Sequence, residues 1–130
     1  MTRTTWLWAA SLGALTTSFA LSPALARHGP IVCPLRLVTG LPCPGCGLVR
    51  AFVATAHGDL HDAFALNAFG PIAWAALAIF VAWYGAELVA RRSLGFQRSL
   101  AKARSGLILL AAAWIGWGVV RLVSALVART

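Results

Sequence analysis

The residues best suited to chemistry lie between Cys33 and Cys46, a stretch that contains all three cysteines of the chain. Cys43-Pro44-Gly45-Cys46 is a C-x-x-C pair placed at the start of an expected short helix. A helix N-terminus stabilises a thiolate, and Arg50, one turn after Cys46, would add positive charge. The pattern predicts thiols that can form a disulfide, exchange with one, or bind a metal.

Three hypotheses therefore compete for this loop. In the first, which we favour, one disulfide closes the loop as a structural staple, with the pairings 33–43, 33–46 and 43–46 all open. In the second, Cys43 and Cys46 are a redox pair, Cys33 is the resolving thiol, and Arg50 assists.

The third hypothesis is a zinc site made by the three cysteines and one histidine. His28, five residues before Cys33, can reach such a site. His57 is a poor fourth ligand, because eleven residues of continuous helix place it about 16 Å from Cys46. His57 and His61 are spaced as a metal pair on one helix, but Gly58 interrupts that helix.

No reaction is predicted from the remaining residues. The chain has only three acidic residues, too few for paired acid–base work, and no nucleophile–base–acid arrangement stands out. The sequence therefore favours a non-enzymatic protein over an enzyme, with the thiol redox site kept as the alternative. No cofactor is predicted, and zinc is kept as the alternative.

The composition is that of an integral membrane protein. Hydrophobic residues make up 60% of the 130 residues and charged residues 11%, and the mean hydropathy is +0.81. A soluble domain of this size could not bury so much apolar surface. The net charge of +8 falls mainly at the ends of apolar segments, which argues against nucleic acid and for a lipid bilayer as the partner.

Three segments are expected to cross the membrane as helices: 6–26, 71–89 and 106–127. The first has a rival interpretation as a cleaved signal peptide, with Ala24-Leu25-Ala26 as the cleavage signal. We favour a retained helix, because the apolar run is long for a signal peptide and Trp6 and Trp8 suit a membrane interface. The expected fold is all-α.

Residues 27–70 form an extracytoplasmic region between the first two spans. Its prolines and glycines predict a shaped loop over 28–47 rather than a helix. A short interfacial helix is expected over 47–56, ended by Gly58, with Asp59 starting a second short turn.

The basic segment 91–104 sets the topology. It holds five positive charges and no acid, so it is expected to be a cytoplasmic loop on the same side as Arg3. The N-terminus is then cytoplasmic and the cysteine loop lies outside.

Two features of the last span stand out. Ala112 and Gly116 form a small-xxx-small pair that suits close helix packing. Arg121 lies two thirds of the way along, where it either snorkels to the headgroups, which we favour, or points inward at a partner.

The cysteine stretch resembles a bacterial membrane family known as domain of unknown function 2752. The resembling residues are Cys33-Pro34, Leu37-Val38-Thr39-Gly40-Leu41-Pro42-Cys43-Pro44-Gly45-Cys46-Gly47-Leu48, Arg50-Ala51, His57-Gly58-Asp59-Leu60, Ala63 and Asn67. Val49 and Ala68 depart from the residues usual in the family. The resemblance implies a small integral membrane protein of undetermined biochemistry.

These observations together predict a multi-pass protein of the bacterial inner membrane. Its expected role is that of a non-enzymatic accessory or scaffold that engages a membrane-protein partner or a second copy of itself. A membrane thiol–disulfide oxidoreductase using Cys43 and Cys46 is the alternative, and a zinc-binding loop is another.

Overall fold

The computed structural model describes residues 3–28, 33–41, 45–92 and 95–130. These residues form helices and no strand, which confirms the all-α class. The helices are α1 (Arg3–Ala20), α2 (Pro23–His28), α3 (Pro34–Thr39), α4 (Leu48–Ala56), α5 (Leu60–Leu66), α6 (Gly70–Ala90) and α7 (Phe96–Val127).

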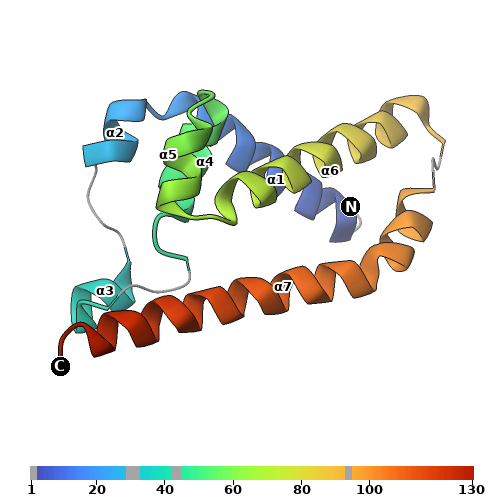
Figure 1. The fold of residues 1–130 in the computed structure, drawn as a ribbon. Helices are drawn as coiled ribbons and strands as arrows, with labels where there is room; N and C mark the ends of the chain where they lie inside the picture. The colour runs from blue at the N-terminus through green and yellow to red at the C-terminus, as the bar shows by residue number, and fades with distance from the viewer. Residues whose placement is uncertain (1–2, 29–32, 42–44, 93–94) are drawn as a thin grey trace.

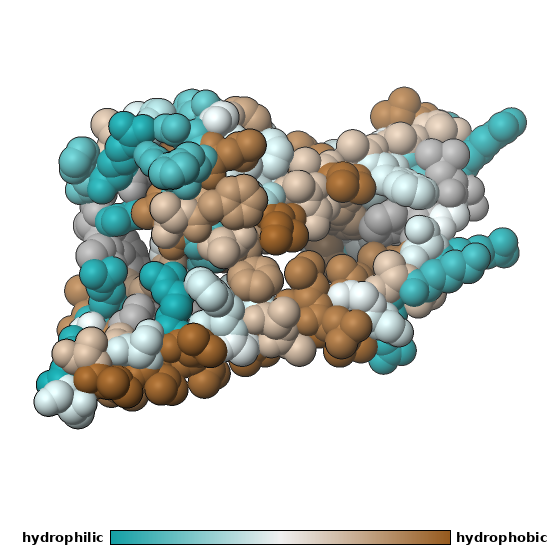
Figure 2. Space-filling model, viewed as in Figure 1, coloured by the Kyte–Doolittle hydropathy of each residue, from teal (hydrophilic) through white to brown (hydrophobic). Residues whose placement is uncertain are grey.

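Two of the described helices, over Gly70–Ala90 and Arg98–Val127, are long and apolar enough to cross a membrane. The expected spans 71–89 and 106–127 lie within them. On the face drawn in Figure 2, hydrophilic residues gather toward both ends of the molecule and hydrophobic residues fill the middle. This is the distribution that a bilayer requires of a protein that spans it.

The expected first span over 6–26 is not one helix. The helix α1 ends at Ala20, and a new helix, α2, begins at Pro23. Proline has no backbone N–H and disfavours the helical conformation in the residue before it, so Pro23 ends one helix and starts the next. The 18-residue α1 is not among the helices that qualify as candidate spans.

The helices α1 and α6 pack side by side in opposite directions. Near the start of α1, the indole N–H of Trp8 donates to the Val81 carbonyl at 3.0 Å. Near its end, the indole N–H of Trp74 donates to the Ser18 hydroxyl at 3.1 Å. Phe19 adds an edge-on ring contact with Trp74, with 5.8 Å between centroids. Both ends of α1 are thus fixed to α6.

The short helices α4 and α5 form a hairpin at one end of α6. The boundaries confirm the expected short helix, its end at Gly58 and the second turn after Asp59. Gly58 has a φ of 83°, and the N–H of Asp59 donates to the Ala54 carbonyl at 2.8 Å. This is the left-handed glycine cap that terminates many helices.

The expectation of a loop without helix over 28–47 is wrong in part. Six residues, Pro34–Thr39, form α3. Proline is compatible with the first turn of a helix because the N–H it lacks would have no partner there. Gly40, with φ 68°, ends the helix, and its N–H donates to the Arg36 carbonyl at 2.8 Å.

The basic segment 91–104 is not a loop over most of its length. The turn between α6 and α7 lies between Arg91 and Gly95, which have φ values of 51° and 81°, and α7 begins at Phe96. Nothing after Gly95 breaks a helix, so Arg98, Lys102 and Arg104 extend the last helix instead.

The helix α7 runs the length of the molecule, and its C-terminal end lies beside α3 (Figure 1). Among the described residues, the helices that pack closely against one another are α1, α2, α4, α5 and α6, and α7 is not one of them. From Arg98 onward its side chains are exposed except for Trp114, Gly118, Arg121, Leu122 and Ala125. These five residues share one helix face, which we call the α7 inner stripe.

Candidate functional site

The second half of the cysteine motif is buried where α4, α5 and α6 meet. Cys46 is 7% exposed and stands just before Gly47, which precedes α4 with φ 83°. A Cβ on Gly47 would lie 2.7 Å from the Leu66 carbonyl oxygen. Both the backbone conformation and the close approach of α5 therefore require glycine at this position.

Asn67 joins the cysteine motif to the start of α6. Its side chain is 2% exposed; its Nδ2 donates to the Cys46 carbonyl at 3.4 Å, and its Oδ1 accepts from the Phe69 N–H at 3.1 Å. The second bond has the better length for a hydrogen bond. Burial of this amide is compatible with stability because both of its polar atoms are bonded.

The helix α6 begins in direct contact with α4. Gly70 is buried, and a Cβ there would collide with the Cβ of Ala51, which is itself 0% exposed. We call Cys46, Gly47, Ala51, Asn67 and Gly70 the α4–α6 junction. Asn67 is hydrogen-bonded within the junction and the other four residues are small, so the helices are tightly packed there.

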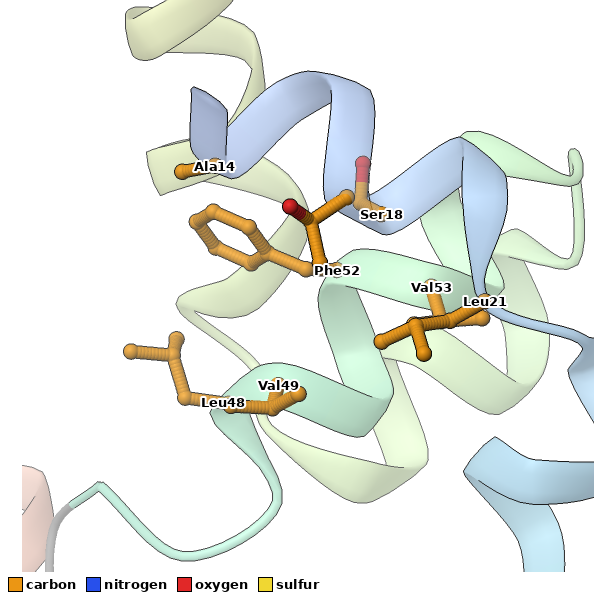
Figure 3. A pocket seen from close by; sticks show the side chains of 8 residues that line it. Ala14, Ser18, Leu21, Leu48, Val49, Phe52 and Val53 are labelled. Carbon is orange, nitrogen blue, oxygen red and sulfur yellow. The ribbon is translucent and has the colours of Figure 1, made fainter. Parts of the chain in front are cut away.

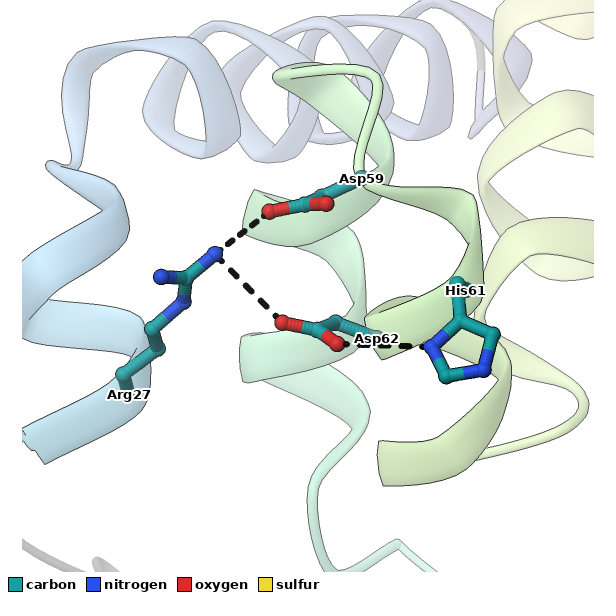
Figure 4. A network of polar contacts seen from close by, with 4 residues as sticks. All are labelled: Arg27, Asp59, His61 and Asp62. Atoms are coloured by element: carbon teal, nitrogen blue, oxygen red, sulfur yellow. Dashed lines mark hydrogen bonds and ion pairs between the residues drawn. The ribbon is translucent and has the colours of Figure 1, made fainter.

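An ion-pair cluster holds α2 against α5. The Arg27 guanidinium lies 2.6 Å from the Asp59 carboxylate and 3.4 Å from that of Asp62. Figure 4 shows Arg27 reaching from α2 toward both carboxylates, with His61 beside Asp62. The His57 ring nitrogen Nε2 adds a hydrogen bond with the Leu21 carbonyl at 3.0 Å, at the break between α1 and α2.

An apolar groove of about 300 Å³ lies between α1 and α4. Figure 3 shows the lining side chains of both helices; the apolar ones are Ala14, Leu21, Leu48, Val49, Phe52 and Val53. Its two hydroxyls are already bonded, Thr17 to the Gly13 carbonyl at 2.7 Å and Ser18 to the Leu15 carbonyl at 2.6 Å. The groove therefore suits hydrocarbon.

Arg129, just after the end of α7, contacts the end of α3, and the sequence did not predict this contact. The Arg129 guanidinium donates to the Thr39 carbonyl at 3.2 Å and to the Gly40 carbonyl at 2.9 Å. These are carbonyls at the C-terminal end of α3, where a cation is favourable. We call this contact the Arg129 latch. In the sequence, only Gly40 indicated an unusual backbone conformation at the end of α3.

The expected thiol residues are described only in part. Cys33 is half-buried at the N-cap of α3, Cys46 is buried, and Arg50 is half-buried on α4. Cys43 lies outside the described residues, so the C-x-x-C geometry and the disulfide pairings stay predictions.

The zinc hypothesis likewise stays a prediction. His28 is exposed at the end of α2. Within the described ranges, no three His, Cys, Asp or Glu side chains are grouped as metal ligands, but the proposed set includes Cys43. His57 and His61 lie on opposite sides of the Gly58 turn, as the sequence indicates.

The chain was compared with known proteins. Neither the curated proteins nor the solved structures contain a match. One family model, described as "Protein of unknown function (DUF2752)", matches residues 33–81. This stretch contains the cysteine motif, the α4–α5 hairpin and the first half of α6, and the match confirms that this part of the chain resembles that family of unknown function.

Proposed function

We propose that the chain is a non-enzymatic accessory or scaffold of the bacterial inner membrane, with its N-terminus in the cytoplasm and its cysteine loop outside. The two candidate spans and the basic N-terminal part of α7 support this placement. The contacts of Trp8 and Trp74 support retention of the first helix, because removal of residues 1–26 would take away its whole interface with α6.

The α4–α6 junction is the observation that carries the proposal. The described motif residues Cys46 and Gly47 serve to join helices, and Asn67 fastens them to α6. A thiol that reacts with another protein must be accessible, whereas Cys46 is 7% exposed. A disulfide closing the loop would complete this joint and present the α4–α5 hairpin as a rigid surface for a partner.

The thiol state of the three cysteines tests this role. Intact membranes would be treated with a membrane-impermeant alkylating reagent, with and without prior reduction, and the protein read by mass. The scaffold predicts one stable disulfide and one inert thiol. A Cys43–Cys46 pair that exchanges readily would overturn it, and labelling that requires chelation would instead identify the zinc loop.

Partner engagement needs a separate test. Crosslinking in native membranes should trap the protein in a specific complex or as a homo-oligomer. Recovery of the chain only as an uncrosslinked monomer would count against a scaffold, even if the disulfide is present. An Asp59→Asn, Asp62→Asn double variant, which changes the hairpin surface without touching the junction, should weaken the crosslink.

The oxidoreductase alternative draws support from the position of Cys46, which stands two residues before the first residue of the nine-residue α4. A thiolate there gains from the helix dipole. If this alternative holds, Cys46→Ser should abolish disulfide exchange with a reporter protein in membranes, while Cys33→Ser should trap a mixed disulfide. Unchanged exchange in the Cys46→Ser variant would eliminate it.

A further inference from the structure

The α7 inner stripe holds two hydrogen-bond donors without a partner in the described part of the chain. The indole N–H of Trp114 is buried and unbonded. Arg121, half-buried on the same face, takes part in no ion pair among the described residues. A half-buried cation on a candidate membrane span that lacks a counterion points to a ligand that supplies one.

The acidic residues of this chain are not placed to neutralise Arg121. The sequence has three acidic residues, Asp59, Asp62 and Glu87. The first two pair with Arg27 of α2. Glu87 lies near the α6–α7 connection, whereas Arg121 is 25 residues, or about 37 Å, along α7 from Phe96. No carboxylate side chain of this chain is therefore placed to pair with Arg121.

The surroundings of Arg121 favour a small anionic group over a partner helix. The inner stripe is partly covered, while the broad apolar surface that a second helix would need lies on the other faces of α7 at Leu109, Val120 and Val127. Gly118 and Ala125, one turn to either side of Arg121, leave little bulk beside it.

The position of Arg121 along α7 matches the depth of a lipid headgroup. Arg121 is six residues before Val127, the last residue of α7, and so about 9 Å from the helix end, within reach of a headgroup. Trp114 lies about two turns deeper.

We propose that the α7 inner stripe binds an anionic phospholipid, with the phosphate on Arg121 and the rest of the lipid along α7 toward Trp114. The site depends on α7 spanning the membrane but not on the scaffold role or the thiol chemistry. Failure of either of those would leave it unaffected.

The test uses the full-length protein in phosphatidylcholine bilayers that contain spin-labelled phosphatidylglycerol. The fraction of label held immobile by the protein reports binding. Measured at about 1 M salt, where the Debye length falls to about 3 Å, exposed arginines attract lipid little and a partly buried site persists. The wild type should keep its preference for phosphatidylglycerol under these conditions.

Three variants separate the site from surface charge. Arg121→Gln should lower the preference about fivefold, the factor expected when one arginine–phosphate attraction that salt does not screen is lost. Arg121→Lys should keep most of it. Arg36→Gln, which removes an exposed arginine of α3, should change nothing at high salt.

Four outcomes would overturn the proposal: no preference in the wild type at high salt, equal losses in Arg121→Gln and Arg36→Gln, displacement of the label by inorganic phosphate, or lipid crosslinks elsewhere. The first would leave a partner's carboxylate as the counterion, and the third would indicate a site for free anions. If Arg121→Gln fails to fold, a photoreactive phosphatidylglycerol crosslinked to the wild type should map to residues 114–125.

Discussion

Asn67 and Gly70 show how two residues at the start of α6 determine the geometry of the cysteine motif. Asn67 bonds to both the Cys46 carbonyl and the backbone of α6, and Gly70 allows α6 to touch Ala51. Neither role can be inferred from composition or periodicity, because each depends on a contact about twenty residues away in the chain. The family resemblance drew attention to Asn67 without giving its role.

Replacement of Asn67 by alanine should destabilise the protein substantially. The change leaves the Cys46 carbonyl and the Phe69 N–H without their side-chain partner, which costs about 1–3 kcal/mol for buried groups. Thermal unfolding in detergent should show a clear drop in apparent Tm. Ser11→Ala, at a hydroxyl bonded only within its own helix, is the control; equal Tm values for the two variants would mean that the Asn67 bonds contribute little.

Gly70→Ala should be destabilising for a steric reason. The added Cβ meets the Cβ of Ala51, and overpacking of this kind costs about 1–3 kcal/mol. Gly116→Ala is the matched control, since a Cβ at Gly116 has no neighbour within 4 Å and alanine favours the helix. Adding Ala51→Gly to Gly70→Ala should bring the apparent Tm in detergent back toward that of the wild type. If the Tm of the double variant stays low, the loss of stability arises elsewhere.

At the scale of whole helices, α1 depends on α6 for its partners. The two indole donors, one from each helix, fix an antiparallel pair at both ends. Their pairing could not be predicted from the sequence, where the tryptophans suggested a membrane interface. The end of α1 was predictable in principle, since Pro23 marks it, but the apolar run beyond Pro23 concealed the break.

Trp8→Phe should loosen this pair while keeping the aromatic ring. The variant loses the bond to the Val81 carbonyl, worth about 0.5–1.5 kcal/mol. Unfolding of α1 from α6, followed by protease cleavage near residue 20, should become faster. Trp117→Phe, at a side chain that is 45% exposed, should cleave at the wild-type rate; faster cleavage there too would point to a general loss of tryptophan packing.

The Arg27 cluster should contribute far less than its short distances suggest. The Arg27 and Asp59 side chains are 55% and 48% exposed, and exposed ion pairs are typically worth about 0–1 kcal/mol. Arg27→Gln should lower the apparent Tm slightly at low salt and not at all at high salt. A large, salt-independent loss would show that Arg27 acts through packing of α2 on α4 instead.

The whole molecule has two polar ends joined by α6 and α7. Much of this was predictable: the two candidate spans, the hairpin ended by Gly58 and the family resemblance follow from periodicity, glycine placement and the cysteine motif. The extension of α7 through the basic segment could not be predicted, because a run of positive charge indicates orientation in the membrane but not secondary structure. The Arg129 latch depends on tertiary placement that no local pattern specifies.

The proposed topology predicts opposite labelling of the two ends. Val38→Cys, at an exposed position on α3 (86%), should react with an impermeant thiol reagent added to intact cells. Ser99→Cys, near the start of α7, should react only after the membrane is opened. The wild type supplies the background from the native cysteines, and labelling of Ser99→Cys in intact cells would refute the topology.

The Arg129 latch can form only late in the synthesis of the chain. Arg129 follows Thr39 by 90 residues, so a ribosome working at about 5–20 residues per second makes the two about 5–20 s apart. During that interval the segment that follows Cys33 has been synthesised, but Arg129 has not yet bonded to the end of α3. The order of synthesis thus gives the cysteines a period in which to find their partners before the arrival of α7 fixes the end of α3.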